Sequence, residues 1–250
     1  MCLDIDSTTQ DIPLLDTTKS IENALLPSWN QTLITLPYLD TLVYNNVKQT
    51  GRTVNKMNSK QQEIATRLEE NIRVQQAIAK NTLGKIDAMV DLILTAYRNG
   101  GKIILCGNGG SAADAQHLAA ELVGRFKLER RALPAIALNT NTSILTALGN
   151  DYGYETVFSR QVEALANKND VVIGLSTSGN SPNIIKAIEA AKAKGAKTIG
   201  LTGGNGGSLA KITDLAIVVP SDNTPRIQEA HITIGHIVCE LVEREIAGAE

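Results

Sequence analysis

Five short apolar runs, each bounded by helical or glycine-rich sequence, most strongly limit the folds open to this chain. The runs are KIILC, PAIAL, VVIGLS, TIGLT and LAIVV, at residues 102–106, 134–138, 171–176, 198–202 and 215–219. Strands that are apolar on both faces are typical of parallel sheets covered by helices on both sides. The sequence therefore predicts an α/β fold, a three-layer αβα sandwich with a five-stranded parallel sheet.

Helical periodicity fills the segments before and between these runs. Ile64, Leu68 and Ile72 lie four apart, and a three-to-four spacing continues from Leu83 until the glycines at 100–101. This predicts a helical arm before the sheet, either two helices or one bent helix that breaks at 81–84. The arm either covers its own sheet or packs on a partner subunit, and the pattern does not choose between the two. Further helices are expected at 143–148, 154–166, 182–194 and 225–246.

Residues 1–56 differ in composition from the rest of the chain. They are rich in Thr, Asn, Leu and Asp, with Pro13, Pro27 and Pro37 interrupting any long helical period. Two interpretations stay open for them: an extension of unknown role, disordered or folded around Trp29, or sequence upstream of a natural start at Met57. We therefore divide the chain into residues 1–56 and a domain at 57–250.

Charge and cysteine content exclude several classes of function. A net charge of −2 and a pI near 6.0 predict no nucleic-acid partner. No apolar run reaches the roughly 18 residues of a membrane span, and Asp4 and Asp6 stand where a signal peptide needs basic residues, so we predict a cytoplasmic protein with no membrane partner. Cys2, Cys106 and Cys239 lack CxxC spacing, which supports neither a disulfide framework nor a thiolate zinc site. We expect Cys106 and Cys239 reduced in a core.

A glycine-rich turn leads from the first run into a helix in the stretch GNGGSAADAQHLAAE, residues 107–121. His117 and Glu121 lie one helical turn apart, so their side chains project from the same face. Backbone amides at the helix start suit an anion. The third glycine of a GxGxxG fingerprint is replaced by Ala112, and no GxxxxGK[ST] motif is present, so a small phosphorylated molecule fits better than a nucleotide.

Two further segments carry candidate chemistry. The loop STSGNS, residues 176–181, offers hydroxyls and amides before a helix that starts at Pro182, which predicts a phosphate site. The loop at 203–207 we interpret as a turn. The final helix contains Gln228, His231 and His236, and spacing alone does not decide which histidine joins Gln228. All three histidines of the chain lie near the predicted ligand loops, which indicates titratable groups or metal ligands.

The motifs together resemble those of a known family. CGNGGSAADAQHLAAEL, PAIAL, GNDYGYE, FSRQVEAL, LSTSGNSPNIIKAIEAA and RIQEAHITIGH occur in the order found in bacterial phosphoheptose isomerases, which belong to the sugar-isomerase (SIS) domain class. The resemblance covers residues 58 to the C-terminus. It implies interconversion of sedoheptulose 7-phosphate and D-glycero-D-manno-heptose 7-phosphate, the first step toward nucleotide-activated heptose, by a homotetramer.

The resemblance also implies a set of site residues. The metal, usually described as zinc, falls on His117, Glu121, Gln228 and His236, which favours His236 over His231. With Glu121 as the carbon base and His236 as the acid, the chain could catalyse the reaction through an enediol; whether Glu121 is base, metal ligand or both stays open. The implied substrate contacts are Asn108, Gly109, Gly110, Glu121, Asn150, Asp151, Ser176, Thr177, Ser178, Ser181 and Gln228.

The rival interpretation comes from non-catalytic SIS-domain tetramers that bind the replication initiator protein. They resemble this chain through the GN-G-SA loop, PAIALNT and RIQE-H, but generally lack the glutamate and the second histidine. This chain has both Glu121 and His236, which favours the enzyme. A sugar-phosphate sensor or a different SIS isomerase would be indicated by loss of the metal quartet, which the sequence retains.

Overall fold

A computed structural model of the chain describes residues 57–248. Both interpretations of residues 1–56 fall outside the described residues, and the division of the chain at residue 57 stays a prediction. The helices are α2 (Ser59–Asn81), α3 (Leu83–Arg98), α4 (Gly110–Val123), α5 (Thr142–Tyr152), the 3-10 helix η1 (Tyr154–Thr156), α6 (Ser159–Leu165), α7 (Pro182–Ala193), α8 (Leu209–Ile212) and α9 (Thr224–Ala247). The strands are β1 (Ile103–Gly107), β2 (Ala135–Ala137), β3 (Val171–Ser176), β4 (Lys197–Gly203) and β5 (Leu215–Val219).

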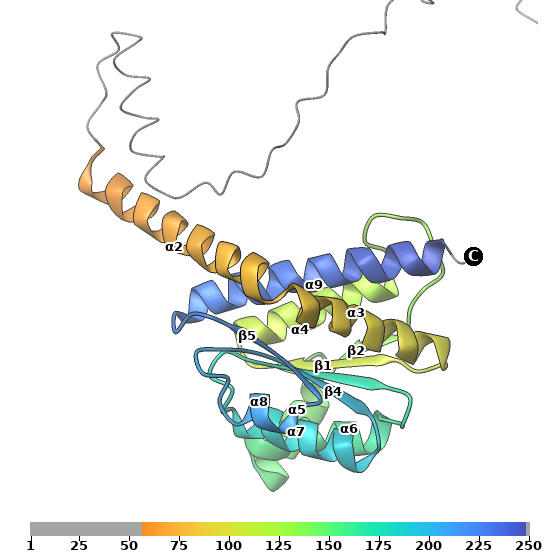
Figure 1. Cartoon of the computed structure of the whole chain (residues 1–250). Helices are drawn as coiled ribbons and strands as arrows, with labels where there is room; N and C mark the ends of the chain where they lie inside the picture. Colours follow the sequence, from red (N-terminus) through yellow and green to blue (C-terminus); the bar gives the residue numbers. More distant parts are fainter. Residues whose placement is uncertain (1–56, 249–250) are drawn as a thin grey trace, which may run out of the picture. The chain divides into compact units, whose positions relative to one another are not determined.

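The described strands form one parallel sheet of five, in the order β2-β1-β3-β4-β5. Helices α3, α4 and α9 lie over one face, and α5 to α8 over the other (Figure 1). Alternate residues of a strand point to opposite faces. Accordingly, Ile103 and Leu105 of β1 join the core under α3, α4 and α9, whereas Ile104 and Cys106 join the core against α6 and α7. The predicted three-layer sandwich is confirmed.

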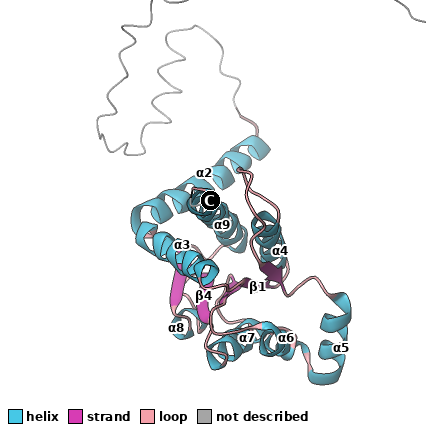
Figure 2. Ribbon diagram, turned by 90° about the vertical axis from the view of Figure 1, so that its right-hand side faces the viewer, coloured by secondary structure: helices cyan, strands magenta, loops and turns pink. Residues whose placement is uncertain are grey.

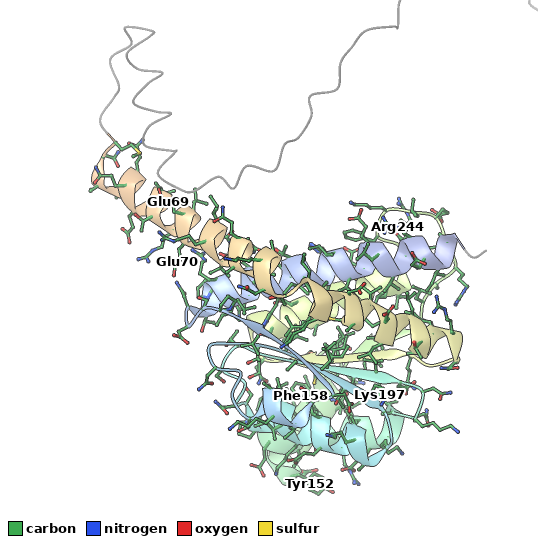
Figure 3. The ribbon with its side chains drawn as sticks, viewed as in Figure 1. Glu69, Glu70, Tyr152, Phe158, Lys197 and Arg244 are labelled. Atoms are coloured by element: carbon green, nitrogen blue, oxygen red, sulfur yellow. The ribbon has the colours of Figure 1, made fainter. Side chains whose placement is uncertain are left out.

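The second core is centred on a large aromatic side chain. Phe158, labelled in Figure 3, is fully buried with Val157 and Val162 against β1, β3 and α7. The helix expected at 154–166 is divided at this buried pair, because η1 ends before residue 157 and α6 begins after residue 158. The short helix α8 was not predicted from the sequence. Cys106 and Cys239 are buried free thiols, as expected.

The helical arm breaks at Thr82, within the predicted segment. Asn58 caps α2 in a capping box with Gln61, whose backbone N–H donates to Asn58 Oδ1 at 2.9 Å. Helix α3 buries its apolar stripe on the sheet, so the second half of the arm covers its own fold. In contrast, α2 leaves Ile64, Leu68 and Ile72 exposed, and it runs out past the end of α9 in Figure 1.

The strand order creates one topological switch point. From β1 the chain crosses to β2 on one side, and it then returns to β3 on the other side. In open parallel sheets ligands bind at the carboxyl ends of the two strands that flank such a point. Here those ends carry the loops at 107–110 and 176–181. Among the described helices, none has both the length and the apolar character needed to cross a membrane.

Candidate active site

The two loops at the switch point are joined by a reciprocal amide pair. Asn108 Nδ2 donates to Asn183 Oδ1 at 2.9 Å, and Asn183 Nδ2 donates to Asn108 Oδ1 at 2.8 Å. Gly109 precedes α4 with φ of 56°, a conformation that suits glycine. Gly110 is the first residue of α4, so the N–H groups of the helix start lie in this loop. Asn108 therefore fixes the first loop against the start of α7.

The loop at 176–181 has the features of an anion site. The hydroxyls of Ser176 and Ser181 lie 2.9 Å apart, and Ser181 precedes α7 without using its side chain as a helix cap. Gly179 has φ of 66°, and a Cβ there would lie 2.1 Å from the carbonyl oxygen of Gly206. Asn180 Oδ1 accepts the N–H of Ser208 at 2.9 Å. Pro182 has no N–H, and the N–H groups of Ile184 and Ile185 donate to Ser181 O at 3.1 and 3.0 Å. The N–H of Asn183 and the hydroxyls of the loop are therefore the donors that an anion would meet there.

A cavity of about 660 Å³ lies beside this loop, at the carboxyl ends of β3, β4 and β5. The sequence interpretation of residues 203–207 as only a turn was incomplete, because the same turn forms one wall of the cavity. The start of α9 forms another wall. The lining residues are Thr177, Ser178, Gly203, Gly204, Asn205, Pro220, Ser221, Asp222, Thr224 and Ile227.

Three predicted site residues converge between α4 and α9. His117 Nε2 lies 3.2 Å from Glu121 Oε1 and 2.9 Å from His236 Nε2. The two imidazole rings meet edge to face, with centroids 5.1 Å apart. The side chain of Glu121 is 21% exposed, whereas that of His117 is 49% exposed. The local pair on α4 and the distant histidine on α9 thus form one cluster open to solvent.

This cluster can hold a metal ion. Its ligand atoms all lie within 4.8 Å of one another. Tetrahedral zinc with bonds of about 2.0–2.2 Å to nitrogen and oxygen separates its ligands by roughly 3.3 Å. The observed separations of 2.9 and 3.2 Å are close to this value. The two imidazole nitrogens and the carboxylate oxygen each direct a lone pair toward the same point. One cation can bind all three lone pairs, whereas a single shared proton can bridge only two of them.

Gln228 lies at the other end of the interface between α4 and α9. A Cβ at Gly110 would lie 2.6 Å from Gln228 Nε2, so the amide rests directly on the start of α4. Eight residues along α9 span about 12 Å between Gln228 and His236. The contacts Gly110–Gln228 and His117–His236 show that the two helices run side by side from the glycine loop to the histidine cluster. The role of Gln228 as a metal ligand stays a prediction.

His231 lies outside the cluster. It is fully buried, with Nε2 3.2 Å from the carbonyl oxygen of Thr202. Burial lowers its pKa to about 4, although the Thr202 contact acts in the opposite direction. The inference that all three histidines serve the ligand site was therefore wrong for His231, which is a neutral core residue.

Asn150 and Asp151 lie apart from these groups in this chain. They are exposed at the end of α5, where Asn150 Nδ2 donates to Asp151 Oδ1 at 2.8 Å. Helix α5 belongs to the layer with α6 and α7, opposite α4 (Figure 2). The neighbouring Tyr152 also points outward, as Figure 3 shows. The part of Asn150 and Asp151 in substrate binding stays a prediction.

Asp114 is a candidate that sequence reasoning missed. It lies on α4 one turn before His117, and burial raises its pKa to about 6, partly offset by His117. Its Oδ2 is buried without a hydrogen-bond partner among the described residues. The three-residue spacing to His117 was the only signal of its place in the sequence.

Known proteins similar to the chain agree on one family. The SIS domain family matches residues 68–203. The chain is 58% identical over 185 residues to a phosphoheptose isomerase of Geobacter sp. (strain M21), a match that covers 74% of this chain and 96% of that relative. It is 65% identical over 152 residues to a phosphoheptose isomerase of a Nitratiruptor species, a match that covers 61% of this chain and 81% of that relative.

Solved structures give the same result. The phosphoheptose isomerase of Neisseria gonorrhoeae has a TM-score of 0.71 at 44% identity, with 74% of this chain and 100% of that one covered. That of Francisella tularensis has a TM-score of 0.72 at 38% identity, with 75% and 100% covered. Together with the fold and the cluster on α4 and α9, these likenesses show that the chain belongs to the phosphoheptose isomerases of the SIS domain family.

Proposed function

We propose that the protein interconverts sedoheptulose 7-phosphate and D-glycero-D-manno-heptose 7-phosphate. The observation that carries this proposal is the convergence of His117 and Glu121, on the helix that starts at the glycine loop, with His236 of α9. The relatives named phosphoheptose isomerase support the substrate class, a phosphorylated sugar. The reaction would be the first step toward nucleotide-activated heptose.

The phosphate would bind at the 176–181 loop. The N–H of Asn183 at the start of α7 and the hydroxyls of Ser176, Thr177, Ser178 and Ser181 would supply donors there, and the turn at Gly179 keeps them in place.

The isomerisation needs one base and one acid. The carboxylate of Glu121 would remove the proton from the hydroxyl-bearing carbon and return it to the neighbouring carbon, through an enediol of the sugar. His236 would donate a proton to the carbonyl oxygen and recover one from the adjacent hydroxyl. Glu121 and His236 both lie beside His117, so the two proton transfers would occur at neighbouring substrate atoms.

We also propose that His117, Glu121 and His236 hold a zinc ion, which Gln228 would join by moving its amide from the start of α4. When bound, zinc would act as a Lewis acid on the oxygens of the sugar. A carboxylate that ligates a cation is a weaker base. Glu121 would therefore either alternate between ligating the ion and acting as the base, or act as the base without ligating the ion. The nitrogen and oxygen donors fit zinc, and the amide is a weak ligand that favours an exchangeable ion.

The oligomeric state we propose is a homotetramer. The exposed Ile64, Leu68 and Ile72 on α2 form an apolar stripe that supports packing against another subunit. Light scattering on purified protein tests the mass directly. The cytoplasmic location also stays a prediction. The rival role as a non-catalytic partner of the replication initiator protein is not favoured, because the relatives are named as isomerases.

The function is tested by incubating the full chain with sedoheptulose 7-phosphate and measuring aldose formation. We expect turnover that a chelator abolishes and added zinc restores. Glu121→Gln should lower kcat by about 10²-fold or more, the range for loss of a positioned base. The matched control is Glu189→Gln, which changes an exposed glutamate on α7 in the other layer and should leave kcat unchanged. Wild-type kcat in Glu121→Gln would remove its proposed role.

A further inference from the structure

Two buried, charged side chains connect the far ends of α4 and α9. Arg130 Nε lies 3.3 Å from Glu243 Oε1, and each side chain is only 1% exposed. Arg130 Nη2 donates to the carbonyl oxygen of Glu121 at 2.9 Å, and Nη1 donates to the carbonyl oxygens of Gly124 and Arg131, also at 2.9 Å. The guanidinium therefore holds the last turn of the helix that carries Glu121.

Glu243 organises the loop that follows α4. Its Oε1 accepts the N–H of Phe126 at 2.7 Å, and its Oε2 accepts those of Lys127 and Leu128 at 2.6 and 2.8 Å. Burial alone would raise the pKa of this carboxyl, but the three N–H groups and Arg130 outweigh it and lower the pKa. Glu243 is therefore ionised and fully engaged, and the loop at 124–131 is fixed to α9.

The same loop reaches the catalytic cluster. The ring of Phe126 packs on the imidazole of His236, with centroids 5.5 Å apart and planes tilted by 30°. Glu243 follows His236 by seven residues, about two helical turns, so both project from the same side of α9. Near the cluster, Gly235 allows Leu118 to approach so closely that a Cβ would lie 2.5 Å from its side chain. Helices α4 and α9 are thus in close contact at the cluster and tied together beyond it.

A contribution to folding stability does not by itself explain why Arg130 and Glu243 form a buried ion pair. A buried ion pair gains little over apolar side chains of the same volume, because both charges lose their hydration. We propose that Glu243 and Arg130 are positioning residues for the isomerisation. By fixing α4, α9 and the loop, they hold Glu121 and His236 toward the same substrate atoms, and Phe126 sets the orientation of the His236 ring. This inference rests on the function proposed above for that cluster.

The test compares two buried carboxylates, each changed to an amide. Asp170 is the matched control because it is also buried and accepts the backbone N–H groups of Lys102 and Asn167 at 2.9 and 2.8 Å, and Lys102 Nζ at 2.7 Å. It lies at the amino ends of β1 and β3, the edge of the sheet opposite the site. Both variants should lower the thermal midpoint.

Only Glu243→Gln should affect the chemistry. Measured below both unfolding transitions, its kcat should fall by about tenfold or more, since small displacements of reacting groups are costly. Its KM should stay within about twofold of the wild type, because the phosphate loop is remote. Asp170→Asn should keep the wild-type kcat. Equal kcat values in Glu243→Gln and the wild type would overturn the proposal.

An imidazole NMR spectrum tests the positioning without turnover. The chain has three histidines, so each can be resolved by isotope labelling. In Glu243→Gln the signals of His117 and His236 should shift, whereas that of the core residue His231 should not. If the wild type does not convert sedoheptulose 7-phosphate, the proposed function fails, and these spectra still decide the positioning role: unmoved His117 and His236 signals refute it.

A second variant covers the case in which Glu243→Gln does not fold. Phe126→Leu removes the ring beside His236 but leaves the backbone N–H that Glu243 accepts. We expect a reduced kcat and a shifted His236 signal, both restored by Phe126→Tyr, which keeps the ring. A wild-type kcat in Phe126→Leu, with the His236 signal unmoved, would refute the proposal in that case.

Discussion

The buried imidazole of His231 should make the fold sensitive to mild acid. Burial lowers its pKa from 6.5 to about 4 in the native protein, with the contact to the Thr202 carbonyl acting in the opposite direction. In the unfolded chain the imidazole titrates near 6.5. Between these values the unfolded chain binds a proton that the native state does not, so stability is complete above pH 6.5 and is lost as the pH falls toward 4.

The size of the effect follows from the two pKa values. A fall from 6.5 to about 4 corresponds to about 3 kcal/mol once the pH lies below both. At pH 5, where the unfolded imidazole is charged and the buried one is still neutral, the loss is about 2 kcal/mol. Asp114 acts in the opposite sense in this window, because its raised pKa makes the native state bind a proton as the pH falls below 6. The wild-type pH dependence therefore contains both contributions.

The comparison that isolates His231 uses His231→Gln, which keeps an N–H donor near Thr202 but does not titrate. Urea unfolding at pH 7.5 and pH 5, at one protein concentration and with chelator present, gives the free energy of unfolding of both proteins. We expect the wild type to lose about 2 kcal/mol more than the variant between these pH values. Asp114 and the other titrating groups are present in both and cancel. Parallel pH dependence of the two proteins would refute the reasoning.

Two further predictions concern the site. Gly179→Ala forces a Cβ to 2.1 Å from the Gly206 carbonyl oxygen at a φ of 66°, so it should raise KM for the sugar phosphate and lower the thermal midpoint, the strain alone costing about 1–3 kcal/mol. Unchanged KM would argue against the loop as the phosphate site. Asp114→Asn removes a carboxylate that burial disfavours, so it should stabilise the protein by about 1 kcal/mol more at pH 8 than at pH 4.5, a value reduced for partial exposure. Equal stabilisation at both pH values, by calorimetry, would contradict this.

The sheet was predictable because its strands are apolar on both faces. In β1, Ile103 and Leu105 enter one core while Ile104 and Cys106 enter the other, and this produces an uninterrupted apolar run. The strand order was not predictable in the same way, since each run fits several positions in a parallel sheet. The order places the loops at 107–110 and 176–181 on the two sides of one switch point, and only tertiary structure reveals the Asn108–Asn183 amide pair between them.

The residues of the candidate site were likewise only partly predictable from the sequence. His117 and Glu121 could be paired from the sequence because helix geometry alone brings residues four apart to one face. His231 and His236 could not be separated by spacing. Five residues turn a helix by about 140°, so one of the two faces α4 and the other faces β4, and which does so depends on how α9 packs. The structure buries His231 against Thr202 and places His236 on His117.

Glu243 shows why the buried ion pair with Arg130 could not be predicted from the sequence. In the polar C-terminal segment ELVEREIAGAE it has the pattern of a solvated helix charge, and Arg130 lies more than a hundred residues away in a loop without periodicity. The structure buries both. Burying a charge costs least where hydrogen bonds replace its hydration, and here the carboxylate accepts three N–H groups of one loop while the guanidinium donates to three carbonyls. Among the described residues, Arg130 Nε makes no hydrogen bond and has only the Glu243 carboxylate beside it at 3.3 Å. The six bonds fix the loop between α4 and α9, and they offset the cost of burial with contacts that, in the proposal above, position Glu121 and His236.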